Sequence, residues 1–201
     1  NKLEKYLNIH KEKIKIIPII ETQKFQIPIK KKNSFLYVSN FSKHKNHFRL
    51  FKALEGVCQE KPYNIELNLT IDQELYEKSF YNSSTTPKNL KIINHGIISN
   101  SQLRELYNSS EFLIYPSLNE SLGMPLVEAV SSECKVIAPD LNYVDQVIIP
   151  SLRFDPKSIS SISKSIIYAI ENYLEASEII IENKIDTFVI YFLLCLKIKL
   201  Y

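Results

Sequence analysis

Short apolar runs alternate with amphipathic segments along most of the chain. The apolar runs have the length and boundaries of buried strands, and they lie at 34–39, 63–71, 90–96, 111–117 and 134–140. Other segments carry apolar residues at helical spacing, at 46–57, 73–80, 103–109, 125–133 and 159–174. A short helix and a short strand are expected at 142–148 and 152–154. This alternation predicts an α/β fold: a Rossmann-like, doubly wound parallel sheet with helices on both faces.

Local signals set the expected ends of two helices. Phe48, Phe51 and Leu54 form the apolar stripe of the helix at 46–57, and Gly56 is expected to end it. Pro125 is expected at the first position of the helix at 125–133, where its missing N–H does no harm.

Composition narrows the classes of function. The chain has 201 residues, 45% of them hydrophobic, and a net charge of only +3, so nucleic acid is not an expected partner. The basic run Lys30–Lys32 is interpreted as a solvated linker. Cys58, Cys134 and Cys195 are far apart and odd in number, so neither a metal site nor a disulfide framework is expected. A reducing compartment fits this pattern.

The usual strand order of a doubly wound sheet places the first and fourth strands side by side. Ligands bind at this switch point, outside the carboxyl ends of the strands. The loops that follow these two strands are NFSKHKNH, at 40–47, and PSLNESLGMP, at 116–125. We therefore expect a ligand site between the two loops, provided that the strand order holds.

Both loops carry groups that suit a phosphorylated ligand. Gly123 allows positive φ or a close approach of the backbone, and the helix after it presents N–H groups and a positive dipole end. Lys43 and Lys45 supply charge for a diphosphate. Because carboxylates would repel phosphates, Glu120 and Glu128 are expected to accept hydrogen bonds from sugar hydroxyls. A diphosphate with a sugar at each end is a nucleotide-sugar.

Each of these residues also has an ordinary structural explanation. A glutamate in the first turn of a helix is favourable with the helix dipole, which would account for Glu128. Glu120 and Lys45 are otherwise solvated surface residues, and Gly123 is otherwise only a turn. Their joint placement on two adjacent loops favours the ligand site.

Three blocks of the sequence resemble the family 4 glycosyltransferases, which have the GT-B fold. The blocks are LYVSNFSKHKNHFRLFKAL, HGIISNSQLRELYNSSEFLIYPS and YPSLNESLGMPLVEAVSSECKVIAPD. The first contains the family's Lys-Asn step, and the last contains its E-x7-E pattern around a Gly-Met-Pro turn. The similarity covers roughly residues 13–174.

Members of that family have two Rossmann-like domains, of which the carboxyl-terminal one binds the nucleotide-sugar donor and the amino-terminal one binds the acceptor. The resemblance is to the donor domain. Residues 1–32 are then the expected interdomain joint and linker, 33–175 the nucleotide-sugar-binding domain, and 176–201 an atypical carboxyl-terminal tail. The acceptor domain is expected to be missing from this chain.

The resemblance implies a role for each matching position. Glu128 would hold the ribose hydroxyls, and Glu120, the expected catalytic residue, would hold the donor sugar and assist its departure. Lys45 would neutralise the diphosphate. The family retains the configuration of the sugar and usually needs no metal ion, so no metal or other cofactor is expected. The expected donor-binding residues are Ser39, Asn40, Lys45, Ile97, Ile98, Glu120, Ser121, Gly123, Met124 and Glu128, with Ile97 and Ile98 against the base.

Some positions depart from the family pattern. Ser39 and Asn40 stand where many members have Gly-Arg, which removes one guanidinium from the phosphate site and leaves more to Lys45. Leu122 stands where an aromatic residue is common. For a histidine that the acceptor domain often supplies, the chain has no aligned replacement. Three histidines are interpreted as polar loop residues: His44, His47 and His95.

The tail also departs from the pattern. Residues 188–196, FVIYFLLCL, are apolar on every side, and they are too few for a membrane-spanning helix, which needs about 20 residues. A buried segment, a peripheral membrane contact and a sequence altered after truncation stay open. The expected location is cytoplasmic, with the inner face of the membrane as an alternative.

Together these features predict the donor half of a retaining, hexosyl-type glycosyltransferase. It would transfer a sugar from a nucleotide diphosphate-sugar to a glycan or lipid-linked acceptor, in polysaccharide biosynthesis. The alternative is a catalytically inactive, stand-alone nucleotide-sugar-binding module or a truncated enzyme remnant. A nicotinamide-dependent dehydrogenase is disfavoured because no G-x-G-x-x-G follows the first strand.

Overall fold

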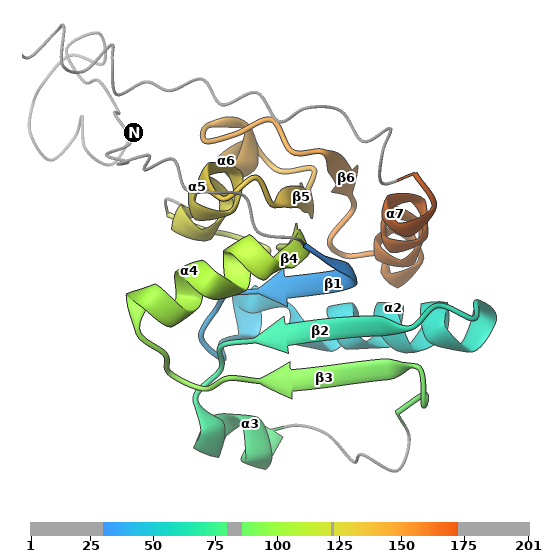
Figure 1. The fold of residues 1–201 in the computed structure, drawn as a ribbon. Helices are drawn as coiled ribbons and strands as arrows, with labels where there is room; N and C mark the ends of the chain where they lie inside the picture. Colours follow the sequence, from blue (N-terminus) through green and yellow to red (C-terminus); the bar gives the residue numbers. More distant parts are fainter. Residues whose placement is uncertain (1–29, 80–85, 122, 173–201) are drawn as a thin grey trace, which may run out of the picture. The chain divides into compact units, whose positions relative to one another are not determined.

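A computed structural model of the chain describes residues 30–79, 86–121 and 123–172. A six-stranded parallel sheet has the order β3-β2-β1-β4-β5-β6 (Figure 1). Its strands are β1 (Lys31–Tyr37), β2 (Ile65–Leu69), β3 (Leu90–Asn94), β4 (Ser110–Ile114), β5 (Lys135–Pro139) and β6 (Leu152–Phe154). The helices are a 3-10 turn, η2 (Lys43–Lys45), and α2 (His47–Glu60), α3 (Gln73–Ser79), α4 (Asn100–Ser109), α5 (Met124–Ser131), α6 (Asn142–Asp145) and α7 (Ile159–Glu171).

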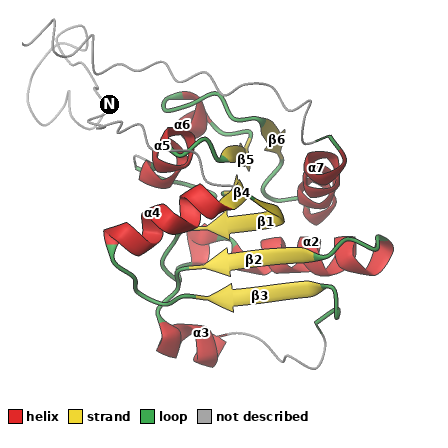
Figure 2. Cartoon of the chain, in the orientation of Figure 1, coloured by secondary structure: helices red, strands yellow, loops and turns green. Residues whose placement is uncertain are grey.

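Helices lie on both faces of the sheet (Figure 2). α2 and α7 pack against each other on one face, while α4 lies on the opposite face over β1 and β4 (Figure 1). The predicted fold class, a Rossmann-like doubly wound parallel sheet, is therefore confirmed.

The centre of the sheet brings the two expected loops together. Phe35 of β1 lies in register with Leu67 of β2 and Phe112 of β4, and the rings of Phe35 and Phe112 stack with centroids 5.0 Å apart. Because β1 and β4 are adjacent and parallel, their carboxyl ends meet at one edge. The following loops touch there, since the backbone N–H of Leu118 donates to the carbonyl of His44 at 2.8 Å. The predicted switch point is confirmed.

Two expectations about the helix that follows β1 are wrong. α2 continues through Gly56 to Glu60, because a glycine in a helix interior costs only about 1 kcal/mol and packing against α7 and the sheet outweighs that cost. Phe48 does not belong to the buried stripe, since it is 69% exposed. The buried face is made by His47, Leu50, Phe51, Ala53, Leu54, Val57 and Cys58.

The basic run at 30–32 is not a solvated linker. Its second residue begins β1, so the predicted boundary between residues 32 and 33 falls inside a strand. The ammonium of Lys30 lies where two helices end, a position that favours a cation. It donates to the carbonyls of Tyr107 (3.2 Å), Asn108 (3.2 Å) and Ser132 (3.0 Å).

Other expectations are corrected or fall outside the described residues. Pro125 is the second residue of α5, which begins at Met124. Residues 1–29, most of the expected joint at 1–32, lie outside the described residues, as do the tail at 176–201 and Leu122. Across 30–79, 86–121 and 123–172, no helix combines the length and the apolar character needed to cross a bilayer.

Candidate functional site

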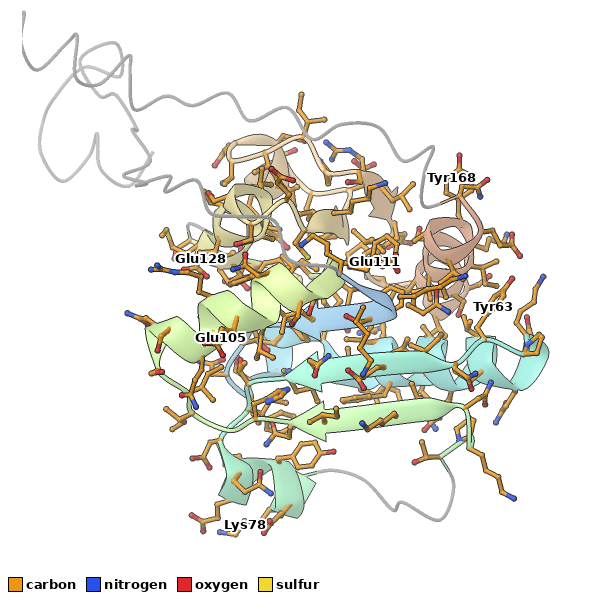
Figure 3. All side chains as sticks on the ribbon, viewed as in Figure 1. Tyr63, Lys78, Glu105, Glu111, Glu128 and Tyr168 are labelled. Atoms are coloured by element: carbon orange, nitrogen blue, oxygen red, sulfur yellow. The ribbon has the colours of Figure 1, made fainter. Side chains whose placement is uncertain are left out.

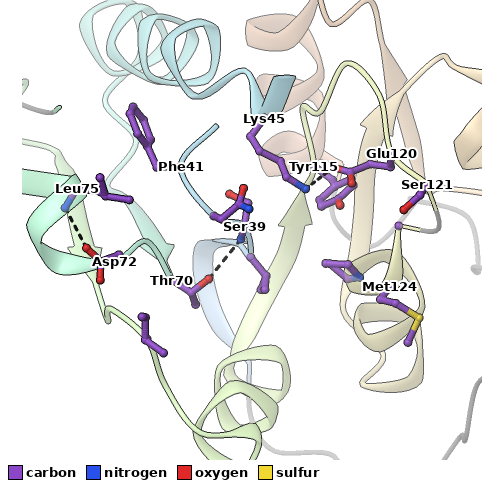
Figure 4. Close-up of a pocket in the computed structure, with 15 residues that line it drawn as sticks. Ser39, Phe41, Lys45, Thr70, Asp72, Leu75, Tyr115, Glu120, Ser121 and Met124 are labelled. Atoms are coloured by element: carbon purple, nitrogen blue, oxygen red, sulfur yellow. Dashed lines mark hydrogen bonds and ion pairs between the residues drawn. The ribbon is translucent and has the colours of Figure 1, made fainter. Parts of the chain in front are cut away.

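A cavity of about 470 Å³ opens at the carboxyl ends of the central strands (Figure 4). Most of the expected donor-binding residues line it, namely Ser39, Asn40, Lys45, Ile97, Glu120, Ser121, Gly123 and Met124. Ile98 and Glu128 are not among its lining residues. The other lining residues, which the sequence did not single out for this site, are Val38, Phe41, Thr70, Asp72, Leu75, Tyr115 and Pro125.

Lys45 and Glu120 form an ion pair between the two loops. The Nζ atom of Lys45 lies 2.6 Å from Oε1 of Glu120, and the two side chains are only 12% and 11% exposed (Figure 4). The ammonium also lies 5.8 Å from the centroid of the Tyr115 ring, within the range of a cation–π contact. The sequence assigned Lys45 and Glu120 to different parts of a ligand, whereas the structure joins them in one charge pair.

The surroundings of Glu120 favour its charged form. Burial by itself would raise the pKa of this carboxyl, but hydrogen bonds from Lys45, Ser117 and Tyr115 outweigh burial and bring the pKa below its ordinary value. Burial and the charge of Glu120 raise the pKa of Tyr115, so this phenol keeps its proton. The cavity therefore presents a cation and an anion side by side at neutral pH.

Asn46 holds the lysine loop in place. Its backbone is left-handed, with φ 60°, a conformation that asparagine and glycine tolerate better than other residues. Its side-chain Nδ2 donates to the carbonyl of Pro116 at 3.1 Å and to that of Pro156 at 2.7 Å. A Lys-Asn or Lys-Gly step is thus what this turn requires, and the asparagine also ties the Lys45 loop to the loop after β4.

Tyr37 and Tyr143, which the sequence did not single out, hold the two loops further. The hydroxyl of Tyr37 donates to the carbonyl of Lys45 at 2.6 Å and lies 3.2 Å from Oγ of Ser117. The hydroxyl of Tyr143 donates to the carbonyl of Ser117 at 2.8 Å. One available signal was that the first and fourth apolar runs each contain a tyrosine, Tyr37 and Tyr115, because a polar tip on a buried ring needs a partner.

The helix after the second loop begins as expected, but with fewer free donors. Gly123 has φ 63° and is the residue before α5. Pro125 has no N–H, and the N–H of Leu126 already donates to the carbonyl of Gly123 at 2.9 Å. The amides of Gly123 and Met124, which both line the cavity, are therefore the donors that this turn offers to an anion.

Glu128 lies further along α5, on the side toward α4 (Figure 3). Its Oε2 accepts a hydrogen bond from the hydroxyl of Tyr107 at 2.8 Å. Tyr107 is almost fully buried, and burial and the charge of Glu128 raise the pKa of its phenol well above the ordinary value. Glu128 thus contacts Tyr107 and is not among the residues that line the cavity, and its expected contact with ribose stays a prediction.

The opposite end of the cavity is more apolar. Ile97 is 83% exposed at its rim, and Phe41 and Leu75 contribute further apolar surface. Figure 4 shows Asp72 and Leu75 together, away from Lys45 and Glu120. Such a surface is suited to one face of a base, although Ile98, the second residue expected there, does not line the cavity.

The histidines do not share one environment. His47 is not a loop residue: it begins α2 and is buried. His95 is more exposed, and its Nε2 lies 2.8 Å from Oδ1 of Asn68. His44 belongs to η2 and is exposed. Within the described part of the chain, no group of three or more His, Cys, Asp or Glu residues is arranged to hold a metal ion.

Comparison with known proteins places this chain in a family. The sequence matches the family model described as "Glycosyl transferases group 1" over residues 19–187. The O-antigen chain mannosyltransferase RfbU of Salmonella typhimurium is 28% identical over 179 residues, which cover 82% of this chain and 47% of that protein. The chain spans less than half the length of the curated relatives that it matches.

Solved structures agree in fold. A mutant of TarM from S. aureus, in complex with fondaparinux, alpha-GlcNAc-glycerol and UDP, has a TM-score of 0.71 at 15% identity, over 88% of this chain and 36% of that one. The C-terminal domain of LpcC from Francisella tularensis, a glycosyl transferase group 1 family protein, has a TM-score of 0.59 at 17% identity, over 75% of this chain and 81% of that one. Because the family model covers well over half of its length, this chain belongs to the glycosyl transferases group 1 family.

Proposed function

We propose that the chain is the donor-binding half of a retaining, hexosyl-type glycosyltransferase of family 4, and that it lies toward the carboxyl terminus of the full enzyme. The observation that carries this proposal is the Lys45–Glu120 pair in the cavity at the switch point. It sets a cation for a diphosphate beside a carboxylate for a sugar. Family membership and the fold of the LpcC domain support the assignment.

Lys45 would bind the diphosphate without leaving Glu120. An ammonium group has three N–H donors, so one can remain on Oε1 of Glu120 while another reaches a phosphate oxygen. The amides of Gly123 and Met124 would face the same anion. Negative charge that develops on the leaving diphosphate would be met by donors already in place, which is electrostatic catalysis. With this charge supplied by the protein, no metal ion or other cofactor is needed.

The two glutamates would bind the sugars at the two ends of the diphosphate. Glu120 lies in the cavity and would accept hydrogen bonds from the donor sugar. Glu128 keeps Oε2 on Tyr107, and its other oxygen would accept from a ribose hydroxyl. The base would lie against Ile97, at the apolar end of the site.

The acceptor would be a glycan or a lipid-linked sugar, held by a separate acceptor domain. RfbU is an O-antigen chain mannosyltransferase, and UDP is bound in the TarM complex, which supports a nucleotide-sugar donor and a role in polysaccharide biosynthesis. A cytoplasmic enzyme with a peripheral contact at the inner face of the membrane would suit such an acceptor.

Calorimetry with UDP and GDP tests the site. Lys45→Met should weaken binding by about 10- to 100-fold, because a hydrogen bond to a charged group contributes about 1.5–3 kcal/mol. Lys43→Met is the matched control, since Lys43 lies in the same turn and is exposed, and it does not line the cavity. Equal losses in both variants, or no binding of either nucleotide by the unmodified chain, would refute the proposal.

The same measurement separates the two glutamates. Glu128→Ala should weaken nucleotide binding more than Glu120→Ala, because UDP and GDP carry the ribose that Glu128 would hold but lack the donor sugar. Unchanged affinity in both variants would rule out these roles. Nucleotide binding without sugar transfer, even with an acceptor domain supplied, would favour the alternative of an inactive binding module.

A further inference from the structure

We propose that His47 is a positioning residue for the phosphate site: it orients the hydroxyl of Ser39 so that its proton points into the cavity, toward an anionic oxygen of the ligand. The inference rests on the proposed nucleotide binding. Ser39 lines the cavity, and its Oγ lies 2.9 Å from Nε2 of His47. Both residues are buried, so water does not compete freely for this contact.

Aromatic side chains hold the imidazole in place. His47 is 3% exposed. Its ring centroid lies 4.9 Å from that of Tyr37, 5.3 Å from that of Phe41 and 6.4 Å from that of Phe51. A ring surrounded in this way has little freedom to rotate, because interiors are close-packed. The packing therefore keeps Nε2 directed at Ser39.

The protonation of the imidazole suits this role. Burial, and then the charge of Lys45, lower the pKa of His47 to about 4, so the ring is neutral at physiological pH. A neutral imidazole has one N–H and one lone pair. With its proton on Nε2, His47 donates to Oγ of Ser39, so the single proton of Ser39 is not used on the imidazole. That proton also has the hydroxyl oxygen of Tyr37 within reach, and an anionic oxygen in the cavity would be the stronger acceptor.

The backbone of Ser39 is fixed as well. Its N–H donates to Oγ1 of Thr70, at the end of the neighbouring strand, at 3.3 Å. Lys45 is already paired with Glu120, and it would bind the ligand as well. A neutral hydroxyl that no carboxylate engages is thus a useful second donor, and its direction is set from behind by His47.

Nucleotide calorimetry on single and double variants tests the inference. Ser39→Ala should weaken UDP and GDP binding by about tenfold or more, as expected for one lost hydrogen bond to a charged group. His47→Phe keeps a ring and removes the nitrogen, so it should cause a similar loss. His47→Gln keeps an N–H near the position of Nε2 and should bind more tightly than His47→Phe. Combining Ser39→Ala with His47→Phe should add little to either change alone.

If His47 had a purely structural role, His47→Phe would bind nucleotide more tightly than His47→Gln. Thermal unfolding should find His47→Phe more stable than His47→Gln, because it keeps the ring contacts. If affinity follows that same order, or if the losses at Ser39 and His47 are additive, the inference is overturned. No nucleotide binding by the unmodified chain would instead overturn the proposed function.

A spectroscopic measurement covers the case in which the His47 variants do not fold. Nitrogen-15 NMR of the unmodified chain with UDP bound identifies which imidazole nitrogen carries the proton. A proton on Nε2 supports the inference. A proton on Nδ1 alone would make Ser39 the donor to His47, with no proton left for the ligand, and would overturn it.

Discussion

Asn46 offers a quantitative test of how the lysine loop is held. The residue is 5% exposed, has φ 60°, and donates to the carbonyls of Pro116 and Pro156. Its Oδ1 also accepts a hydrogen bond from Nη1 of Arg49 at 2.9 Å. Asn46→Ala removes all three hydrogen bonds and leaves an alanine in the left-handed region. Asn46→Gly removes the same hydrogen bonds but fits the backbone.

The expected losses in the free energy of unfolding follow from the hydrogen bonds and the backbone conformation of Asn46. The two hydrogen bonds to carbonyls contribute about 1–1.5 kcal/mol each, and the one from Arg49 adds to them. Asn46→Gly should therefore lower the free energy of unfolding by at least about 2–3 kcal/mol. The left-handed backbone costs alanine about 1–2 kcal/mol, and the greater freedom of glycine in the unfolded chain offsets about half of that. Asn46→Ala should therefore be about 1 kcal/mol less stable than Asn46→Gly.

Urea unfolding followed by far-ultraviolet circular dichroism measures these differences, and UDP calorimetry reports whether Lys45 is still held in place. Asn100→Ala is the control, because Asn100 is exposed at the start of α4 and should change stability by less than about 0.5 kcal/mol. An Asn46→Ala variant as stable as the unmodified chain, or more stable than Asn46→Gly, would refute the reasoning.

Four further predictions concern the cavity. Glu120→Gln should bind UDP several-fold more tightly while slowing sugar transfer, since it removes a carboxylate beside the diphosphate and frees Lys45; weaker UDP binding by calorimetry would contradict this. The pKa of Glu120 lies below its ordinary value of 4.5, so its contribution to folding stability is present above pH 4.5 and is lost as the pH falls below that value. Below pH 4.5, Glu120→Gln should therefore lose less stability than the unmodified chain, as measured by acid unfolding. Gly123→Ala should destabilise the fold more than Gly96→Ala in urea unfolding: both have positive φ, but only at Gly123 would a Cβ meet a side chain, 3.1 Å from Leu126. A chelator should leave UDP affinity unchanged, and a loss of about tenfold or more, roughly 1.4 kcal/mol, would reveal a metal requirement.

The arrangement of strands and loops could be predicted from the sequence because it depends on local patterns and on a strand order that doubly wound sheets share. Buried parallel strands form continuous apolar runs, so the runs at 34–39 and 111–117 marked β1 and β4 closely. The common strand order then placed their loops together. Gly123, two residues before Pro125, likewise allowed the positive φ that is found at the start of α5.

Contacts between side chains far apart in the sequence could not be predicted in this way. Lys45 and Glu120 are 75 residues apart, and nothing local indicates that they bond to each other. The same holds for the hydrogen bond from Tyr107 to Glu128 and for the burial of His47 behind Ser39. Each depends on how the strands and helices pack.

The class of fold, the edge of the sheet at which the cavity opens and about half of its lining residues could thus be predicted from the sequence. The pairing of Lys45 with Glu120, the contact of Glu128 with Tyr107 and the supporting tyrosines became visible only in the folded chain. This difference arises because periodicity and turn chemistry act over a few residues along the chain. The pairing and burial of charged side chains depend instead on atoms from distant parts of the sequence, which only packing brings within a few ångströms.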